Sequence, residues 1–153
     1  MITLGFTGTQ RGMTIEQTVA VATVVRFLRP NAAHHGDCLG ADAQFDLTAA
    51  WYLIPRTAHP GLDANGDSPK RAYCRCETVL DPEPYLVRNR AIVAASSALV
   101  GAPSGPEVVR SGTWSTIRHA RLTIPTYIAY PDGRITYAVR EPDGSFGETE
   151  VFL

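Results

Sequence analysis

Glycines and small polar residues gather in three segments that could hold a phosphate group. In the first segment, residues 5–12, the candidate ligand-binding residues are Gly8, Thr9, Gln10 and Arg11. Glycines let backbone N–H groups approach a phosphate, and hydroxyl and guanidinium groups add contacts. No Gly-Lys-Ser/Thr follows, and the spacing is not the Gly-x-Gly-x-x-Gly of dinucleotide-binding turns. Taken alone, this segment fits a tight turn as well as a ligand site.

The second segment, residues 34–42, places carboxylates and glycines ahead of a predicted helix. Asp37 or Asp42 could bond a ribose hydroxyl, and the helix start beside Gly40 would lie near anionic groups. Alternatively, Asp37 caps the helix and Gly40 only permits close packing. His34 and His35 end a strand, where packing is a commoner role for histidine than catalysis.

The third segment, residues 110–116, is rich in hydroxyl groups and enters another predicted helix. Its candidate phosphate ligands are Ser111, Gly112, Thr113 and Thr116. A helix N-terminus favours an anion, and the segment holds more hydroxyl groups than an N-cap requires. Trp114 could stack on a base or pack in the core. Arg88, in the preceding predicted helix, would add a positive charge.

The three cysteines, Cys38, Cys74 and Cys76, bear on metals and on cellular compartment. Cys74 and Cys76 are separated by one residue, whereas common zinc motifs separate their ligands by roughly two to four. We therefore expect ordinary thiols, no metal and no cofactor. An odd number of cysteines and the lack of a signal-peptide pattern predict a cytoplasmic protein.

The composition narrows the class of protein. The chain has 153 residues, of which 44% are hydrophobic and 19% charged, which excludes a disordered chain and predicts one domain over residues 1–153. The net charge of −1 argues against nucleic acid as a partner. No apolar run approaches the roughly 20 residues that span a membrane, so we expect no membrane partner.

Short apolar strands alternate with amphipathic helices along most of the chain. Strands are predicted at residues 2–6, 32–35, 53–59, 98–102, 125–130, 135–139 and 149–153, and helices at 14–29, 41–52, 81–95 and 113–122. This order predicts an α/β, Rossmann-like fold, with a mostly parallel sheet, helices on both faces and a C-terminal antiparallel edge. Thr14 and Gln17 have the spacing of a capping box. Residues 60–84 form a long loop that is either functional or partly mobile.

The three polar segments lie where the predicted strands end, which is where α/β sheets bind ligands. In order and spacing, residues 5–9, 35–42, 88–90 and 111–116 resemble the SLOG superfamily, named for Smf/DprA and Lonely Guy proteins. The likeness is closest to its small YspA-like members and extends from the first predicted strand to the fifth. It implies a Rossmann-like fold and a nucleotide or nucleotide-derived ligand, and it leaves a homodimer or a higher oligomer open.

The superfamily includes both enzymes and binding proteins. Lonely Guy phosphoribohydrolases carry Gly-Gly-x-Gly-Thr-x-x-Glu, and placing its Gly-Thr on Gly112 and Thr113 puts Thr116 where the catalytic Glu stands. Arg88 matches the arginine of that enzyme family. DprA-like proteins carry Ser-Gly-Ser-x-x-Thr, which is close to the segment beginning at Ser111.

Two functions follow from the sequence. The first is binding of a nucleotide or nucleotide-derived ligand in a phosphate-cradling cleft, where the candidate residues above should meet. The alternative is an N-glycosidase that releases the base from a nucleoside monophosphate. That reaction needs a carboxylate near the anomeric carbon, for which the candidates are Asp37, Asp42 and Glu107.

Overall fold

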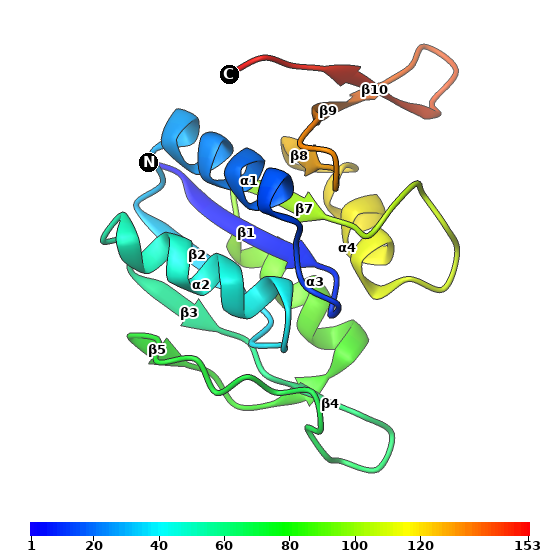
Figure 1. Ribbon diagram of the computed structural model, residues 1–153. Helices are drawn as coiled ribbons and strands as arrows, with labels where there is room; N and C mark the ends of the chain where they lie inside the picture. Colours follow the sequence, from blue (N-terminus) through cyan, green and yellow to red (C-terminus); the bar gives the residue numbers. More distant parts are fainter.

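A central sheet between two layers of helices makes up most of the protein, as a computed structural model of residues 1–153 shows (Figure 1). The elements in chain order are β1 (Thr3–Gly8), α1 (Ile15–Leu28), β2 (Ala32–His35), α2 (Ala41–Trp51), β3 (Arg56–Ala58), β4 (Gly61–Leu62), β5 (Thr78–Val79), β6 (Glu83–Pro84), α3 (Tyr85–Ala95), β7 (Ala98–Ala102), α4 (Gly112–Ala120), β8 (Thr126–Ala129), β9 (Ile135–Arg140) and β10 (Phe146–Glu150).

The sheet has eight strands in the order β10-β9-β8-β7-β1-β2-β3-β5. All pairings from β8 to β5 are parallel, whereas β9 pairs antiparallel with both β8 and β10. The order reverses direction at β1, so the neighbouring β1 and β7 ends form the crevice in which ligands of such sheets bind. The predicted fold class is confirmed.

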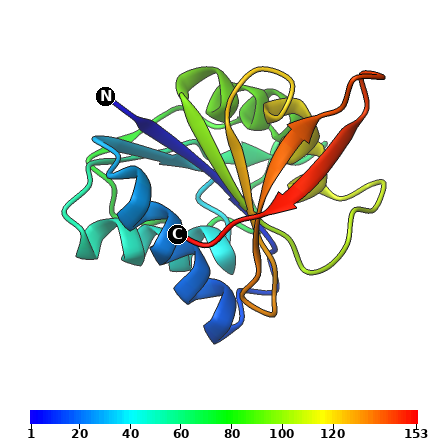
Figure 2. The ribbon, with the colours of Figure 1, turned by 90° about the horizontal axis from the view of Figure 1, so that it is seen from above.

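Helices α1 and α2 cover one face of the sheet, and α3 and α4 cover the other (Figure 2). Under α1 and α2 lies a core of 17 buried residues, in which the rings of Phe6 and Phe45 stack 4.4 Å apart. A second core of seven residues, including Trp114 and Ile117, lies under α4. None of the four helices has the length and apolar character that a membrane span requires.

Only half of the predicted capping box forms at the start of α1. The Thr14 hydroxyl accepts a hydrogen bond from the backbone N–H of Gln17 at 3.0 Å. The Gln17 side chain turns inward instead, and its Nε2 donates to the carbonyls of Pro103 and Ala129, both at 2.7 Å. Because these carbonyls follow β7 and belong to β8, Gln17 fixes α1 to the sheet.

Three predicted elements have a boundary that differs from the structure by at least three residues. Helix α3 begins at Tyr85 rather than at residue 81, because Glu83 and Pro84 pair with β4 before the helix starts. The last strand covers residues 146–150 rather than 149–153, because pairing resumes directly after the tight turn at Gly144. Strand β3 begins only at Arg56, after Pro55, whose ring lacks the N–H that a strand uses.

The long segment at residues 60–84 is bonded to the loop that follows β2. The Leu39 N–H donates to the carbonyl of Lys70 at 2.8 Å, and the Ala72 N–H donates to the carbonyl of Asp37 at 2.7 Å. The segment also supplies β5, which pairs with β3 at the sheet edge. It thereby forms one wall at the carboxyl end of the sheet.

Candidate functional site

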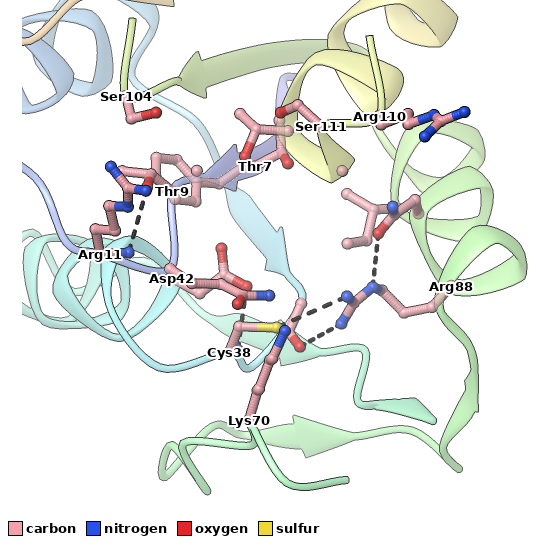
Figure 3. Close-up of a pocket in the computed structure, with 18 residues that line it drawn as sticks. Thr7, Thr9, Arg11, Cys38, Asp42, Lys70, Arg88, Ser104, Arg110 and Ser111 are labelled. Atoms are coloured by element: carbon pink, nitrogen blue, oxygen red, sulfur yellow. Dashed lines mark hydrogen bonds between the residues drawn. The ribbon is translucent and has the colours of Figure 1, made fainter. Parts of the chain in front are cut away.

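A cavity of about 390 Å³ opens at the carboxyl ends of β1, β2 and β7 (Figure 3). Its walls come from the β1–α1 loop, the loop after β2, helix α3 and the start of α4. The structure brings most of the predicted site residues to this cavity, namely Gly8, Thr9, Gln10, Arg11, Asp42, Arg88, Ser111, Gly112 and Thr113.

Arg88 is the most firmly held cation in the cavity. Its side chain is buried, and Nη1 donates to the carbonyls of Gly36 at 2.5 Å and of His59 at 3.0 Å. Its Nε donates to the Asn89 side chain at 2.7 Å. None of the ion pairs in the protein includes Arg88. A buried guanidinium is costly without an anion, so this charge favours an anionic ligand.

Asp42 is the carboxylate that lines the cavity. It is buried in the first turn of α2, and its Oδ2 accepts the backbone N–H of Cys38 at 3.1 Å. Burial raises the pKa of Asp42, and the nearby Arg88 guanidinium and His35 ring only partly oppose that rise. A carboxyl group with a raised pKa can donate or accept a hydrogen bond at the cavity wall.

The N-terminus of α4 forms another wall of the cavity. The Ser111 hydroxyl caps the helix by accepting the Trp114 N–H at 3.2 Å. The N–H groups of Gly112 and Thr113, in the first helical turn, have no partner within the helix and lie at the cavity. The third segment therefore supplies both a cap and donors that suit an anion.

The cavity concentrates positive charge. Arg11, Lys70, Arg88 and Arg110 line it beside the single carboxylate of Asp42, although the chain as a whole has a net charge of −1. Lys70 points toward Cys38, whereas Arg110 extends outward at the rim (Figure 3). A cleft lined by one sign of charge attracts ligands of the other sign.

Three predicted ligand-binding residues do not line the cavity. Asp37 is buried, where its carboxylate accepts Arg71 Nε at 3.0 Å and the Cys74 N–H at 2.8 Å. Gly40 permits a close approach, since a Cβ there would lie 2.3 Å from the carbonyl oxygen of Gln10. The Thr116 hydroxyl donates to the Gly112 carbonyl at 2.9 Å inside α4.

Two other candidates also have structural roles. Glu107 lies outside the cavity, where it forms ion pairs with Arg118 and Arg121, both at 3.2 Å. Trp114 does not reach a ligand, because its ring is buried beside Tyr130 and its Nε1 donates to the Gly105 carbonyl at 3.2 Å. Trp114 is therefore a residue of the second core, and its buried ring is not available to stack on a base.

Sequence reasoning missed several cavity residues, among them Thr7, Cys38, Lys70, Asn89, Ser104 and Arg110. Cys38 and Asn89 lie inside the segments that carry the family resemblance, and Arg110 directly precedes Ser111. Their nearness to these motifs could have indicated that they line the cavity. Lys70 is the only lysine of the chain, but nothing local to it indicates the cavity.

His35, Asp46 and Cys76 form a polar cluster whose potential ligand atoms lie within 4.8 Å of one another. His35 Nε2 is 2.9 Å from Asp46 Oδ1 and 3.5 Å from Cys76 Sγ. The Asp37 N–H donates to His35 Nδ1 at 3.0 Å, so the neutral ring carries its proton on Nε2, the atom that a metal would need. Burial and Asp46 raise the pKa of the Cys76 thiol to about 12. These contacts describe a hydrogen-bonded cluster.

Fold and cavity together define a class: a Rossmann-like α/β protein with a cation-lined cavity at the carboxyl edge of its sheet. No family model matches the sequence, and a search of curated proteins gave no significant match. Among solved structures, the fold is similar to "the molybdenum cofactor binding protein from the phototrophic bacterium Rippkaea orientalis", with a TM-score of 0.61 and 12% identity. The match covers 84% of this chain and 76% of that chain. At this identity the likeness supports the fold alone.

Proposed function

We propose that the cavity binds a nucleotide or nucleotide-derived small molecule through its phosphate, in the manner of a SLOG protein. The observation that carries the proposal is Arg88, a buried guanidinium that forms no ion pair, although Asp42 lies near it. It lines the same cavity as the first turn of α4. A phosphate would satisfy both the charge and the free N–H groups.

The remaining walls suit the rest of such a ligand. Asp42 offers a carboxyl oxygen to ribose hydroxyls, and Thr7, Thr9 and Ser104 add hydroxyl groups. The apolar lining is small, with Phe6 and Ile92 as its main members. Polar contacts to the phosphate and the sugar would therefore contribute more to affinity than contacts to the base. The volume falls within the roughly 300–1,000 Å³ of small-molecule sites.

Binding without rapid turnover is the form of this function that the residues favour. Thr116, which stands at the Lonely Guy Glu position, is buried and bonded inside α4, so it offers no base. General-base catalysis typically contributes about 10²–10⁴-fold. N-glycosidase activity is the second candidate, and Asp42 alone among its proposed carboxylates lines the cavity.

The test combines binding with product analysis. Thermal-shift and calorimetric titrations would use nucleoside mono-, di- and triphosphates, ribose 5-phosphate and inorganic phosphate. Because the structural neighbour is named for binding molybdenum cofactor, that cofactor belongs in the same screen. Chromatography of each mixture would measure free base.

Arg88→Ala is the decisive variant, and Arg90→Ala is its matched control, since Arg90 is exposed and does not line the cavity. We expect Arg88→Ala to weaken binding at least tenfold, in line with the roughly 1.5–3 kcal/mol of a charged hydrogen bond, and Arg90→Ala to bind as wild type. Equal binding by both variants would refute the site. Rapid base release that Asp42→Asn abolishes would favour the N-glycosidase instead.

A further inference from the structure

A second cavity, of about 550 Å³, lies at the other edge of the sheet from the candidate site. Val25 of α1 lines it together with Pro30 and Ile54, which stand just before β2 and β3 begin. Amino and carboxyl ends of parallel strands lie at opposite edges of a sheet, and the two cavities share no lining residue. We call this second site the amino-edge cavity. The ends of α1 and α2 meet beside it, on the side of the N-terminus (Figure 1).

The buried part of the amino-edge cavity is apolar. Val25 is 2% exposed and Ile54 is 7% exposed, and Pro30 is also buried. The rings of Phe27 and Tyr52 line the cavity and are partly open to solvent. The volume falls within the roughly 300–1,000 Å³ of small-molecule sites. The cavity can therefore accommodate the hydrocarbon part of a small ligand, in contrast to the polar lining of the candidate site.

The charged side chains of this cavity are two arginines. Arg26 and Arg29 line it, and both are exposed. Neither forms an ion pair, and no Asp or Glu lines the cavity. Leu153 also lines it, and even with the α-carboxylate of Leu153 counted, an excess of one positive charge remains. Apolar walls beside guanidinium groups without partners are complementary to an amphipathic anion.

The backbone of Arg29 indicates that this side chain serves more than the fold. Arg29 ends α1 in a left-handed conformation, with φ of 50° and ψ of 57°, and its N–H donates to the Val25 carbonyl at 2.9 Å. Glycine is the usual residue at such a position, because a Cβ is unfavourable there. A helix C-terminus favours a cation, but Arg26 in the last turn already supplies one. A strained position that keeps a guanidinium at a cavity points to a ligand for that group.

We propose that the amino-edge cavity binds an amphipathic carboxylate, a molecule with one carboxylate head and an unbranched hydrocarbon chain. Arg26 and Arg29 would bind the carboxylate through charged hydrogen bonds. The hydrocarbon chain would cover Val25, Pro30 and Ile54 and remove them further from water. A carboxylate suits the cavity better than a phosphate monoester, because its single negative charge matches the single excess positive charge.

Calorimetric titrations of wild type with amphiphiles below their micelle concentrations test this ligand class. We expect decanoate to bind, and affinity to rise about fourfold for each CH₂ group from hexanoate to decanoate. Acetate, which lacks the chain, and decyltrimethylammonium, which carries the opposite charge, should bind at least tenfold more weakly than decanoate. Equal affinity for decanoate and decyltrimethylammonium, or affinity that does not depend on chain length, would overturn the proposal.

Variants test the place of binding. Arg29→Gly should weaken decanoate binding at least tenfold while the unfolding temperature stays the same or rises, because glycine suits the left-handed position. Arg26→Gln should weaken binding similarly without a change of backbone. Arg90→Gln, on exposed α3 surface, is the matched control and should bind decanoate as wild type does. Arg88→Ala should also bind as wild type, so the result does not depend on the nucleotide site. Decanoate binding that Arg29→Gly leaves unchanged, or that Arg88→Ala abolishes, would overturn the proposal.

Discussion

The guanidinium of Arg88 and the carboxylate of Asp42 converge on Gly36 without forming an ion pair. A Cβ at Gly36 would lie 2.6 Å from Arg88 Nη1 and 2.8 Å from Asp42 Oδ2. Backbone groups position both side chains, since carbonyls accept from Arg88 and the Cys38 N–H donates to Asp42. Because the two side chains do not neutralise each other in an ion pair, both can still form polar contacts with a ligand.

Gly36→Ala should disturb the cavity directly. Because the new methyl group would displace Arg88 or Asp42, we expect a loss of about 1–3 kcal/mol in unfolding free energy, as for overpacking in a core, together with weaker ligand binding. Urea denaturation and calorimetry measure the two effects. Gly105→Ala is the control, since a Cβ there meets nothing within 4 Å. Equal stability of the two variants would contradict the packing argument.

Gly112→Ala separates binding from folding. A Cβ at Gly112 has nothing within 4 Å, and alanine favours a helix over glycine by up to about 1 kcal/mol. The unfolding temperature should therefore stay the same or rise. Since Gly112 lines the cavity at the first turn of α4, the methyl group should reduce affinity for phosphate-bearing ligands in calorimetric titration. Unchanged affinity would show that the ligand does not approach the start of α4.

Asp42→Asn should change how affinity depends on pH. Burial raises the pKa of Asp42, so the carboxyl group gains its negative charge only above its usual range, and that charge repels an anion. Wild-type affinity should fall as pH rises through this pKa. The Asn variant, which carries no charge at this position, should bind more tightly at high pH and show a flatter profile. Titrations with sulfate, a phosphate analogue whose charge stays the same between pH 5 and pH 8, would measure both profiles, and parallel profiles would contradict this role.

His34 and His59 should make the fold sensitive to acid. Their rings are hydrogen-bonded, with Nδ1 of His34 2.7 Å from Nε2 of His59. Burial lowers the pKa of both rings, that of His59 to about 4, whereas the unfolded chain binds these protons near pH 6.5. Their contribution to stability is therefore present above about pH 6.5 and is lost as pH falls toward 4.

Replacement of one ring tests that linkage. His59→Gln leaves no titratable group at this position, so its unfolding temperature should fall less between pH 7 and pH 4.5 than that of wild type. His119→Gln, on the partly exposed side of α4, should keep the wild-type slope. Identical slopes for His59→Gln and wild type would show that the pair does not determine the acid response.

The sequence predicted the sheet because its signals are local. Apolar strands and amphipathic helices alternate, and each strand end carries its own glycine and hydroxyl residues, so the first and third segments reach the cavity as expected. Asp37 misled the prediction because its backbone adopts a left-handed conformation, with φ of 54°, and its carboxylate faces Arg71 rather than the helix start. Lys70 was not predicted because its position also depends on a contact between residues that are far apart in the sequence. The ion pair between Asp37 and Arg71 holds Lys70 at the cavity, and no local sequence pattern indicates that ion pair.

Arg71→Ala should therefore loosen the wall that carries Lys70. The change removes the ion pair with Asp37 and leaves a buried carboxylate whose remaining partner is the Cys74 N–H. Loss of one partner of a buried pair costs about 3 kcal/mol, and we expect a fall of that order in urea denaturation, faster proteolysis within residues 60–84 and weaker phosphate binding. As a control, Arg75→Ala should change none of these properties, because Arg75 is exposed and forms no ion pair in the same segment.

A double variant separates the charge of Asp37 from its hydrogen bonds. Adding Asp37→Asn to Arg71→Ala should recover part of the stability, because the buried side chain at position 37 then carries no charge. A double variant less stable than Arg71→Ala alone would show that Asp37 supports the wall by its hydrogen bonds rather than by its charge.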